Sequence, residues 1–268
     1  MKCPPEDGCL PYVHVPQPPP IPPLVGRTNQ TSKAMQKRIT LCACSSRTII
    51  DRGQAVRFAV AARKAGCEVR LVADLCQLCQ QHDAAVADIA QTTIVGCHKR
   101  AVETLMAHAG QQVSHVLCLR DNTADALLAE LGISPAEDAA MAAETEAEMG
   151  VMPCRHGDDA WNPVIDKRLC GECGKCLDFC PFGVYEMVDD RIRVVHPTNC
   201  KNNCPACART CPAGAIIFPK YDRSPINGGD SQEESAVKLD SRSLYGDALR
   251  NRLAQRKAGV SLLKKSNQ

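Results

Sequence analysis

Short apolar runs alternate with helical stretches between residues 38 and 121. Four runs have the length and the β-branched content of buried strands, and each is bounded by turn or helix signals. The predicted strands are Arg38 to Cys42, Val69 to Ala73, Thr93 to Gly96 and Val116 to Leu119. The alternation is typical of parallel β–α units, so we expect a small parallel-sheet α/β domain at 38–121.

Helices are predicted between these strands, at 52–65, 83–90 and 99–109, and Gly66 ends the first of them. Residues 122–160 are expected to form a helical connector, because the stretch up to Gly150 is rich in Ala and Glu. Ser134 followed by Pro135, with Glu137 three positions after the serine, predicts a helix start there.

A second pattern occupies residues 161–222. Predicted strands cover 164–165, 184–188, 191–195 and 215–218, with a hairpin at Asp189-Asp190. A short helix is expected after each of two cysteine-rich runs. The resulting order is strand–helix–strand–strand–helix–strand, which predicts a small α+β domain.

The two ends of the chain have other compositions. Residues 1–37 form a proline-rich arm that favours an extended chain, either along a neighbouring surface or disordered. Residues 223–268 are expected to be a polar linker followed by a C-terminal helix with Leu244, Leu249 and Leu253 on one face. That helix could dock on a partner or pack onto its own chain.

The composition narrows the class of protein. A net charge of +2 from 32 basic and 30 acidic residues gives no reason to expect nucleic acid as a partner. No run reaches the roughly 18 apolar residues of a membrane span, and the N-terminus shows no apolar leader. Eighteen cysteines without a leader favour a reducing, cytoplasmic setting with metal-bound thiolates.

Eight of the cysteines form two runs that each end in Cys-Pro. They are Cys170, Cys173, Cys176 and Cys180, then Cys200, Cys204, Cys207 and Cys211. The first run has the spacing of bacterial ferredoxins, and the stretch resembles the ferredoxin module with two [4Fe–4S] clusters. Two zinc sites, which also use sets of four thiolates, are the alternative.

The resemblance implies that the fourth cysteine of each run serves the other cluster. The expected ligands of cluster 1 are Cys170, Cys173, Cys176 and Cys211, and those of cluster 2 are Cys200, Cys204, Cys207 and Cys180. The second run departs from the module, because residues 201–203 separate its first two cysteines where two residues are usual. The longer loop should change the hydrogen bonding around cluster 2, so the two potentials are expected to differ.

A further group of cysteines follows the predicted strands of the α/β domain. They are Cys42, Cys44, Cys76, Cys79 and Cys97. The carboxyl ends of parallel strands form the edge at which open sheets bind ligands, so a third cluster is possible there. Metal-free buried thiols are the alternative. We expect Cys67 and Cys118 to lie in the core. We expect Cys154 to be unligated. No metal is assigned to Cys3 and Cys9.

The patterns CAC, ADLCQLC and GCHKRA after the first three strands resemble the N-terminal domain of the large flavoprotein of heterodisulfide reductase. The resemblance implies a third [4Fe–4S] cluster held by Cys42, Cys44, Cys79 and Cys97, with Cys76 as the competitor of Cys79. The heterodisulfide reductase protein binds flavin, but this chain has no Gly-x-Gly-x-x-Gly after a strand, so no flavin is predicted.

Two residues beside Cys97 could take part in its chemistry. His98 could be a ligand or a proton-coupled neighbour, although a lone histidine is more often solvent-facing. Arg100 could stabilise a reduced cluster or form a surface salt bridge.

The sequence therefore predicts an iron–sulfur electron-transfer protein or subunit with no substrate chemistry of its own. The resemblance implies redox partners, namely a flavoprotein or another iron–sulfur subunit in a soluble complex. One alternative is thiol or sulfur chemistry by the strand-end cysteines, since Cys76 and Cys79 have redox-pair spacing. No helix is expected to start at that pair, which disfavours this alternative. A docking or structural subunit is the other alternative.

Overall fold

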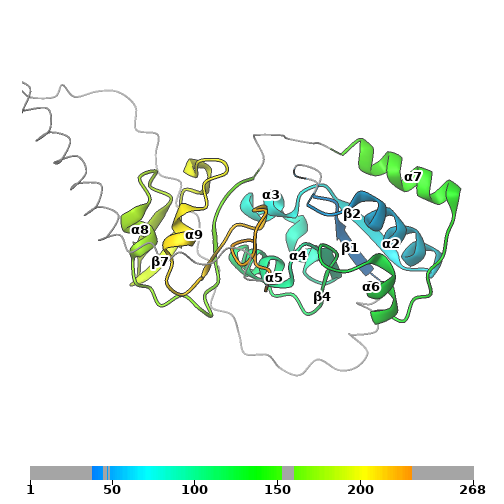
Figure 1. Cartoon of the computed structure of the whole chain (residues 1–268), viewed down its shortest axis with the longest axis horizontal. Helices are drawn as coiled ribbons and strands as arrows, with labels where there is room; N and C mark the ends of the chain where they lie inside the picture. Colours follow the sequence, from blue (N-terminus) through cyan, green and yellow to red (C-terminus); the bar gives the residue numbers. More distant parts are fainter. Residues whose placement is uncertain (1–37, 45–46, 48, 153–159, 231–268) are drawn as a thin grey trace, which may run out of the picture.

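The computed structural model describes residues 38–44, 47, 49–152 and 160–230 (Figure 1). The predicted arm and C-terminal helix, and also Cys3, Cys9 and Cys154, lie outside the described residues. Within the described part, an α/β domain and a ferredoxin-type domain lie side by side.

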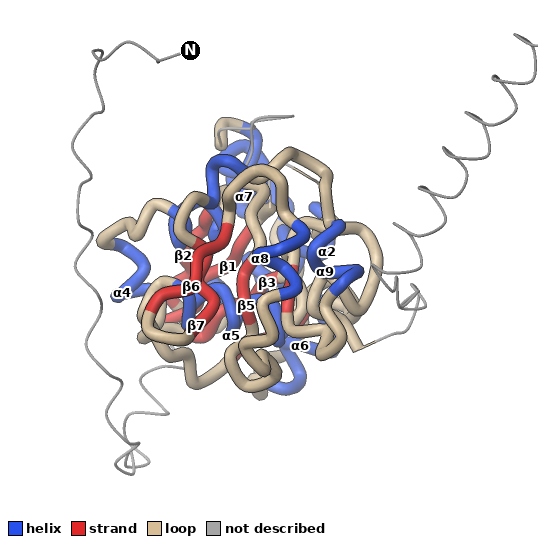
Figure 2. The backbone as a smooth tube through the Cα atoms, turned by 90° about the vertical axis from the view of Figure 1, so that its left-hand side faces the viewer, coloured by secondary structure: helices blue, strands red, loops and turns tan. Residues whose placement is uncertain are grey.

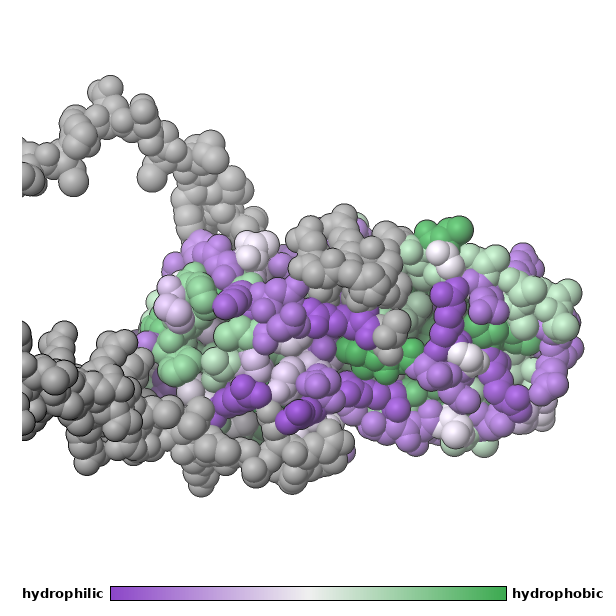
Figure 3. All heavy atoms as spheres, turned by 45° about the horizontal axis from the view of Figure 1, so that its top comes forward, coloured by the Kyte–Doolittle hydropathy of each residue, from purple (hydrophilic) through white to green (hydrophobic). Residues whose placement is uncertain are grey.

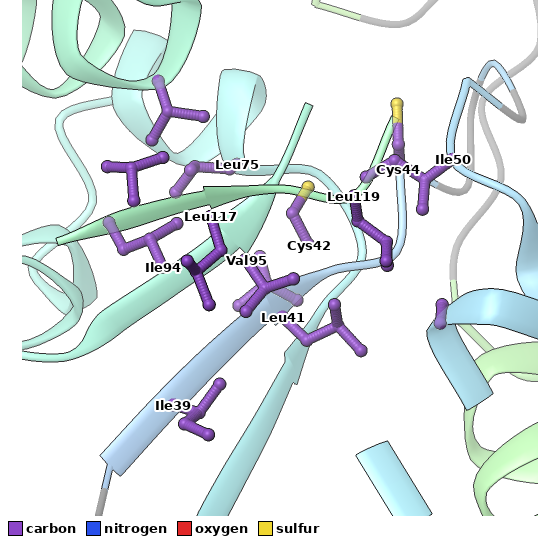
Figure 4. Packing of buried hydrophobic residues seen from close by; sticks show 14 of the residues in the cluster. Ile39, Leu41, Cys42, Cys44, Ile50, Leu75, Ile94, Val95, Leu117 and Leu119 are labelled. Atoms are coloured by element: carbon purple, nitrogen blue, oxygen red, sulfur yellow. The ribbon is translucent and has the colours of Figure 1, made fainter. Parts of the chain in front are cut away.

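The α/β domain contains a four-stranded parallel sheet with the strand order β2-β1-β3-β4. Its strands are β1 (Arg38–Cys42), β2 (Glu68–Val72), β3 (Thr93–Gly96) and β4 (Val116–Cys118). Each predicted strand is confirmed to within one residue at its ends. The central strands are apolar because both faces of the sheet are covered, and Figure 4 shows this buried packing around β1 and β3.

Helices connect and cover these strands. They are α2 (Arg52–Lys64), α3 (Leu75–Gln80), α4 (Ala85–Ile89), α5 (Lys99–His108), α6 (Ala124–Glu130) and α7 (Ala139–Gly150). Asp51 is the N-cap residue of α2, and its carboxylate accepts a hydrogen bond from the Gln54 amide at 2.8 Å. Both α6 and α7 pack on α2, so the connector predicted after residue 122 returns to cover the α/β domain.

Two helix predictions were wrong. Helix α7 begins after Asp138, whose side chain accepts a hydrogen bond from the Met141 amide at 3.1 Å, and so Ser134 is not its cap. Helix α3 was not predicted, because its single turn and a half is too short for a clear apolar period. Its cap is Asp74, which accepts a hydrogen bond from the Gln77 amide.

The strand order places a topological switch point between β1 and β3. The chain runs from β1 outward to β2, and then from β3 outward to β4 on the other side. Right-handed crossovers put the connecting helices of the two halves on opposite faces of the sheet. The crevice at the carboxyl ends of β1 and β3 is the place where open α/β sheets bind ligands.

The ferredoxin-type domain has the predicted element order, but each short helix lies within its cysteine run and not after it. It consists of β5 (Val164–Ile165), α8 (Lys175–Phe179), β6 (Tyr185–Val188), β7 (Arg191–Val194), the 3₁₀ turn η1 (Pro197–Asn199), α9 (Ala206–Thr210) and β8 (Ile216–Ile217). β5 pairs with β8, and β6 pairs with β7 through a hairpin in which Asp189 and Asp190 have φ values of 51° and 57°. Asp tolerates this left-handed conformation, which the tight turn requires.

The two domains share a packed boundary. Val164 and Ile217, from the β5–β8 pair, belong to the same buried cluster as the α/β core. Figure 2, seen from the ferredoxin end, shows β5, β6 and β7 in front of the parallel sheet. The arrangement brings the carboxyl edge of that sheet next to the ferredoxin-type domain.

The stretch predicted as the start of a polar linker is partly buried, with Ser224 and residues 226–229 buried. We call residues 222–230 the strap, because they run back along the α/β domain between the two units (Figure 1). Asn227 is fully buried, and Gly228 adopts a φ of +90° in which an added Cβ would lie 2.8 Å from the Ala101 nitrogen. The close approach requires glycine and explains why this polar sequence is not a solvated linker here.

In Figure 3, hydrophilic residues cover much of the visible face and apolar residues form separate patches. Among the described residues, no helix combines the length and the apolar character that crossing a bilayer requires.

Candidate iron–sulfur sites

The structure brings the four predicted cluster 1 cysteines around one hollow. Cys170, Cys173 and Cys176 line it from the loop before and the first turn of α8, and Cys211 lines it from the end of α9. Gly174 has a φ of 74°, which turns the chain at the start of α8. Ile165, Ile192 and Ile216 supply an apolar wall. Four thiols around an apolar hollow are the donor set that an iron–sulfur cluster needs.

The predicted cluster 2 cysteines also lie near one another. Burial raises the pKa of the Cys200 thiol to about 12, and the neighbouring Cys204 and Cys180 thiols act in the same direction. Burial also raises the pKa of Cys207, and Cys200, Cys180 and Cys204 add to this increase. The Cys200 and Cys207 thiols therefore keep their protons at neutral pH until metal binds, so metal binding releases protons from them.

Tyr185 is a neighbour of the predicted cluster 2 cysteines that the sequence did not reveal. Its hydroxyl donates a hydrogen bond to the Cys207 sulfur at 3.0 Å, and the ring is buried in the domain core. A hydrogen bond to a ligand sulfur stabilises the reduced, more negative cluster and therefore raises its potential.

We expect Tyr185→Phe to lower one of the two ferredoxin potentials and to leave the other unchanged. The phenylalanine keeps the packing of the ring but cannot donate the hydrogen bond. Redox titration followed by electron paramagnetic resonance checks this expectation. Equal shifts of both potentials, or no shift, would contradict it.

Known proteins resemble the ferredoxin-type domain. Residues 162–212 match the 4Fe-4S dicluster domain family. Ferredoxin-3 of a Nostoc species is 35% identical over 92 residues, which cover 26% of this chain and 89% of that protein. The chain belongs to the 4Fe-4S dicluster ferredoxin family. It therefore contains [4Fe–4S] clusters, and its role is electron transfer.

Other relatives are longer than the matched stretch. An uncharacterized ferredoxin of Methanocaldococcus jannaschii is 44% identical over 63 residues, 23% of this chain and 43% of that protein. A formate dehydrogenase-O iron-sulfur subunit of Escherichia coli is 30% identical over 95 residues, 32% of each chain. The chain thus spans less than half the length of these two relatives.

Upstream of this ferredoxin domain, a second thiol group lies at the switch point of the parallel sheet. The strand-end thiols are those of Cys42, Cys44, Cys76 and Cys97. Figure 4 shows the sulfurs of Cys42 and Cys44 at the end of β1, above the apolar side chains of the sheet. Gly96 ends β3 close to β1, since a Cβ added there would lie 3.9 Å from the Cys42 Cβ.

The strand-end thiols lie close enough to influence one another. Burial raises the pKa of Cys97 to about 12, and Cys42 acts in the same direction. Burial also raises the pKa of Cys44 and of Cys76, and the Cys97 thiol adds to both increases. Cys44 has a φ of 45°, an uncommon conformation for a residue other than glycine, Asn or Asp. The turn through Cys44 allows both thiols of the Cys-x-Cys pair to lie at one edge.

Cys79 differs from these four. Its side chain is fully buried, and its sulfur lies 3.6 Å from the Met106 sulfur between α3 and α5. Among the strand-end thiols, only Cys42 contributes to the elevated pKa of Cys79, which burial raises to about 12. On α3, Cys76 faces the other strand-end thiols, whereas Cys79 faces the core.

Lys220 reaches the strand-end thiols from the ferredoxin domain. Its side chain is 2% exposed and pairs with Asp74, the cap of α3, which is 11% exposed. Burial raises the pKa values of Cys42, Cys44 and Cys76, the Asp74 carboxylate adds to this increase, and the Lys220 ammonium offsets a smaller part of it. The ion pair of Lys220 and Asp74 therefore lies near all three thiols. No local sequence pattern indicated this residue, because Asp74 lies 146 positions away.

His98 and Cys118 do not lie where they were expected. His98 is 4% exposed, not solvent-facing, and its Nδ1 lies 2.9 Å from the Asp121 carboxylate. Cys118 ends β4 at the same edge, half-buried, with its sulfur 3.4 Å from Asp121. Gly229 of the strap covers the His98 ring, because a Cβ there would lie 2.8 Å from Cε1. Asp121 can accept hydrogen bonds from both side chains.

Arg100 forms a partly buried ion pair rather than the expected surface bridge. It donates to the Asp166 carboxylate at 3.0 Å and to the Gly214 carbonyl at 2.7 Å, and so it joins α5 to the ferredoxin domain. Asp166 is 3% exposed. Burial would raise the pKa of Asp166, but hydrogen bonds from Arg168 and Arg100 outweigh burial and lower it.

The helix at Cys76 and Cys79 corrects the prediction that no helix starts at this pair. Both cysteines lie on α3, so the pair does begin a helix. Thiol exchange nevertheless requires a thiolate, and burial raises the pKa of both thiols. The buried environment therefore disfavours a reactive dithiol.

Proposed function

We propose that the chain relays single electrons through three [4Fe–4S] clusters, two in the ferredoxin domain and one at the strand-end thiols. Cys170, Cys173, Cys176 and Cys211 would hold cluster 1, and Cys180, Cys200, Cys204 and Cys207 would hold cluster 2. The observation that carries the proposal is the group of four thiols at the switch point, on the side of the sheet that the ferredoxin domain covers.

For the third cluster we propose Cys42, Cys44, Cys76 and Cys97 as ligands. Cys76 replaces Cys79, which the resemblance to the heterodisulfide reductase flavoprotein had favoured. The contact of Cys79 with Met106 in the core supports this choice, since that sulfur would have to leave the core to bind iron.

We also propose that the chain works within a larger redox complex. The E. coli relative is named as an iron–sulfur subunit of a formate dehydrogenase. The resemblance of residues 38–110 to the heterodisulfide reductase flavoprotein suggests that the partner is a flavoprotein or another iron–sulfur subunit. The strand-end thiols would then connect the ferredoxin clusters with that partner.

The iron content of the anaerobically purified chain tests this proposal. We expect about twelve irons and twelve acid-labile sulfides per chain, four for each cluster. About eight irons would leave the ferredoxin clusters and remove the third one. Zinc bound in place of iron at the strand-end thiols would overturn the relay at that site.

A further inference from the structure

The extra residue in the second cysteine run lies at the boundary between the domains. Residues 201–203 separate Cys200 from Cys204, one residue more than in the usual module. Asn203 adopts a φ of 62°, a left-handed conformation that asparagine tolerates better than most residues. The inserted turn therefore presents two adjacent asparagine side chains, Asn202 and Asn203, next to the α/β domain.

Arg47 of the α/β domain binds this turn. Its guanidinium donates to Oδ1 of Asn202 at 2.6 Å and to Oδ1 of Asn203 at 2.5 Å. The Arg47 amide donates to the Cys44 carbonyl at 3.2 Å, so the same residue is fixed to the backbone of a strand-end thiol. One side chain thus links the loop between two cluster 2 cysteines with the turn that carries Cys44.

Trp161 extends the contact. The Arg47 guanidinium lies 4.8 Å from the centre of the Trp161 ring, which stacks on Phe218 with a centroid distance of 5.2 Å. Trp161 and Phe218 also line a small hollow together with Cys76 and Lys220. The aromatic pair therefore lies between the strand-end thiols and the ferredoxin core.

A second arginine provides a comparison. Arg100 follows Cys97 by three positions, as Arg47 follows Cys44, and it too crosses to the ferredoxin domain. Its acceptors are the Asp166 carboxylate and the Gly214 carbonyl, and Gly214 follows the cluster 1 cysteine Cys211. Neither acceptor of Arg100 lies between two ligands of one cluster, whereas both acceptors of Arg47 do.

We propose that Arg47, Asn202 and Asn203 form a clasp that positions cluster 2 against the strand-end thiols and makes it the ferredoxin cluster that exchanges electrons with them. The inference rests on the proposed function, since it needs a cluster at the strand-end thiols. One electron moves from the reduced centre to the oxidised one, and no bond or proton changes place. Arg47 is a positioning residue in this proposal, and the additional residue of the second run is what allows it to bind.

The test compares Arg47→Ala and Arg47→Lys with Arg100→Ala in the full chain. Redox titration with electron paramagnetic resonance gives the potentials, and Tyr185→Phe identifies the potential that belongs to cluster 2. Removing the guanidinium should disfavour reduction of cluster 2 about tenfold, which is a shift of about 59 mV to lower potential for one electron. Arg47→Lys should restore part of the shift, and Arg100→Ala should not move this potential.

The transfer itself is measured after flash reduction of the anaerobic protein by a photoexcited deazaflavin. Slower oxidation of cluster 2 by the strand-end cluster in Arg47→Ala, with a normal rate in Arg100→Ala, is the expected result. Unchanged potential and rate in Arg47→Ala, or equal slowing in Arg100→Ala, would overturn the clasp.

Deleting Asn203 gives a second variant. It restores the usual two-residue spacing, so cluster 2 is expected to assemble while the clasp is lost, with the same slowing as Arg47→Ala. A normal rate in this variant would also overturn the clasp. Iron analysis separates the two proposals. About eight irons in the unaltered chain refute the third cluster. About twelve irons in the unaltered chain, together with a normal rate of electron transfer in Arg47→Ala or in the Asn203 deletion, refute only the clasp.

Discussion

Replacing Cys76 by alanine is expected to lower the iron content of the anaerobic protein from about twelve to about eight atoms per chain. The reason is geometric, since the Cys76 thiol lies with those of Cys44 and Cys97 at the switch point. A cluster that loses one of its four thiolates at a buried site is expected to be lost as a whole. The electron paramagnetic resonance signals of the two ferredoxin clusters should remain.

Cys79→Ala is the matched control for this experiment. The two cysteines lie on the same short helix, three positions apart, but Cys79 packs against Met106 in the core. We expect this variant to keep about twelve irons and to lose only packing. If Cys79→Ala lost four irons and Cys76→Ala kept them, the ligand assignment would be reversed.

The second large effect is expected from Lys220→Met, which should destabilise the protein by about 3–5 kcal/mol because it leaves a buried carboxylate without its partner. Asp74 is 11% exposed, so water cannot fully replace the lost ammonium. Urea unfolding under anaerobic conditions, followed by circular dichroism, measures the change. The potential of the strand-end cluster should fall as well, because a positive charge near its ligands is lost.

The double variant Asp74→Asn with Lys220→Met is the control. It removes both charges and keeps a good capping residue at the start of α3, so most of the lost stability should return. The exposed pair of Arg57 and Asp125 offers a second control, whose loss should change the free energy of unfolding far less because solvent screens the charges. If the Lys220→Met protein were as stable as the unaltered chain, the ion pair of Lys220 and Asp74 would make no contribution to stability.

The ferredoxin domain could be predicted from sequence because its information is local. The first three cysteines of each run are so closely spaced that one loop and the helix turn after it position them, and the Asp189-Asp190 turn marks the hairpin directly. The four parallel strands were equally evident, since buried central strands are continuous apolar runs.

The choice between Cys76 and Cys79 could not be made from sequence. Both residues lie on a helix of six residues, which is too short to show an apolar period. Which of the two can bind metal depends on whether its side chain faces the core or the switch point. His98 was placed in solvent for a similar reason. It is buried by Gly229 of the strap, which lies far along the chain and has no local signal.

The strap also bears on how such a chain could exchange parts. The family match of the chain ends at residue 212. The packed structure that contains the ferredoxin domain continues through Asn227 and Gly228. A stand-alone ferredoxin that replaced residues 162–212 would pack in the same way only if the fusion kept the strap and Lys220, which precedes it. A recombination that preserves the packing must therefore exchange the chain as far as the strap, beyond the last cysteine of the motifs, Cys211.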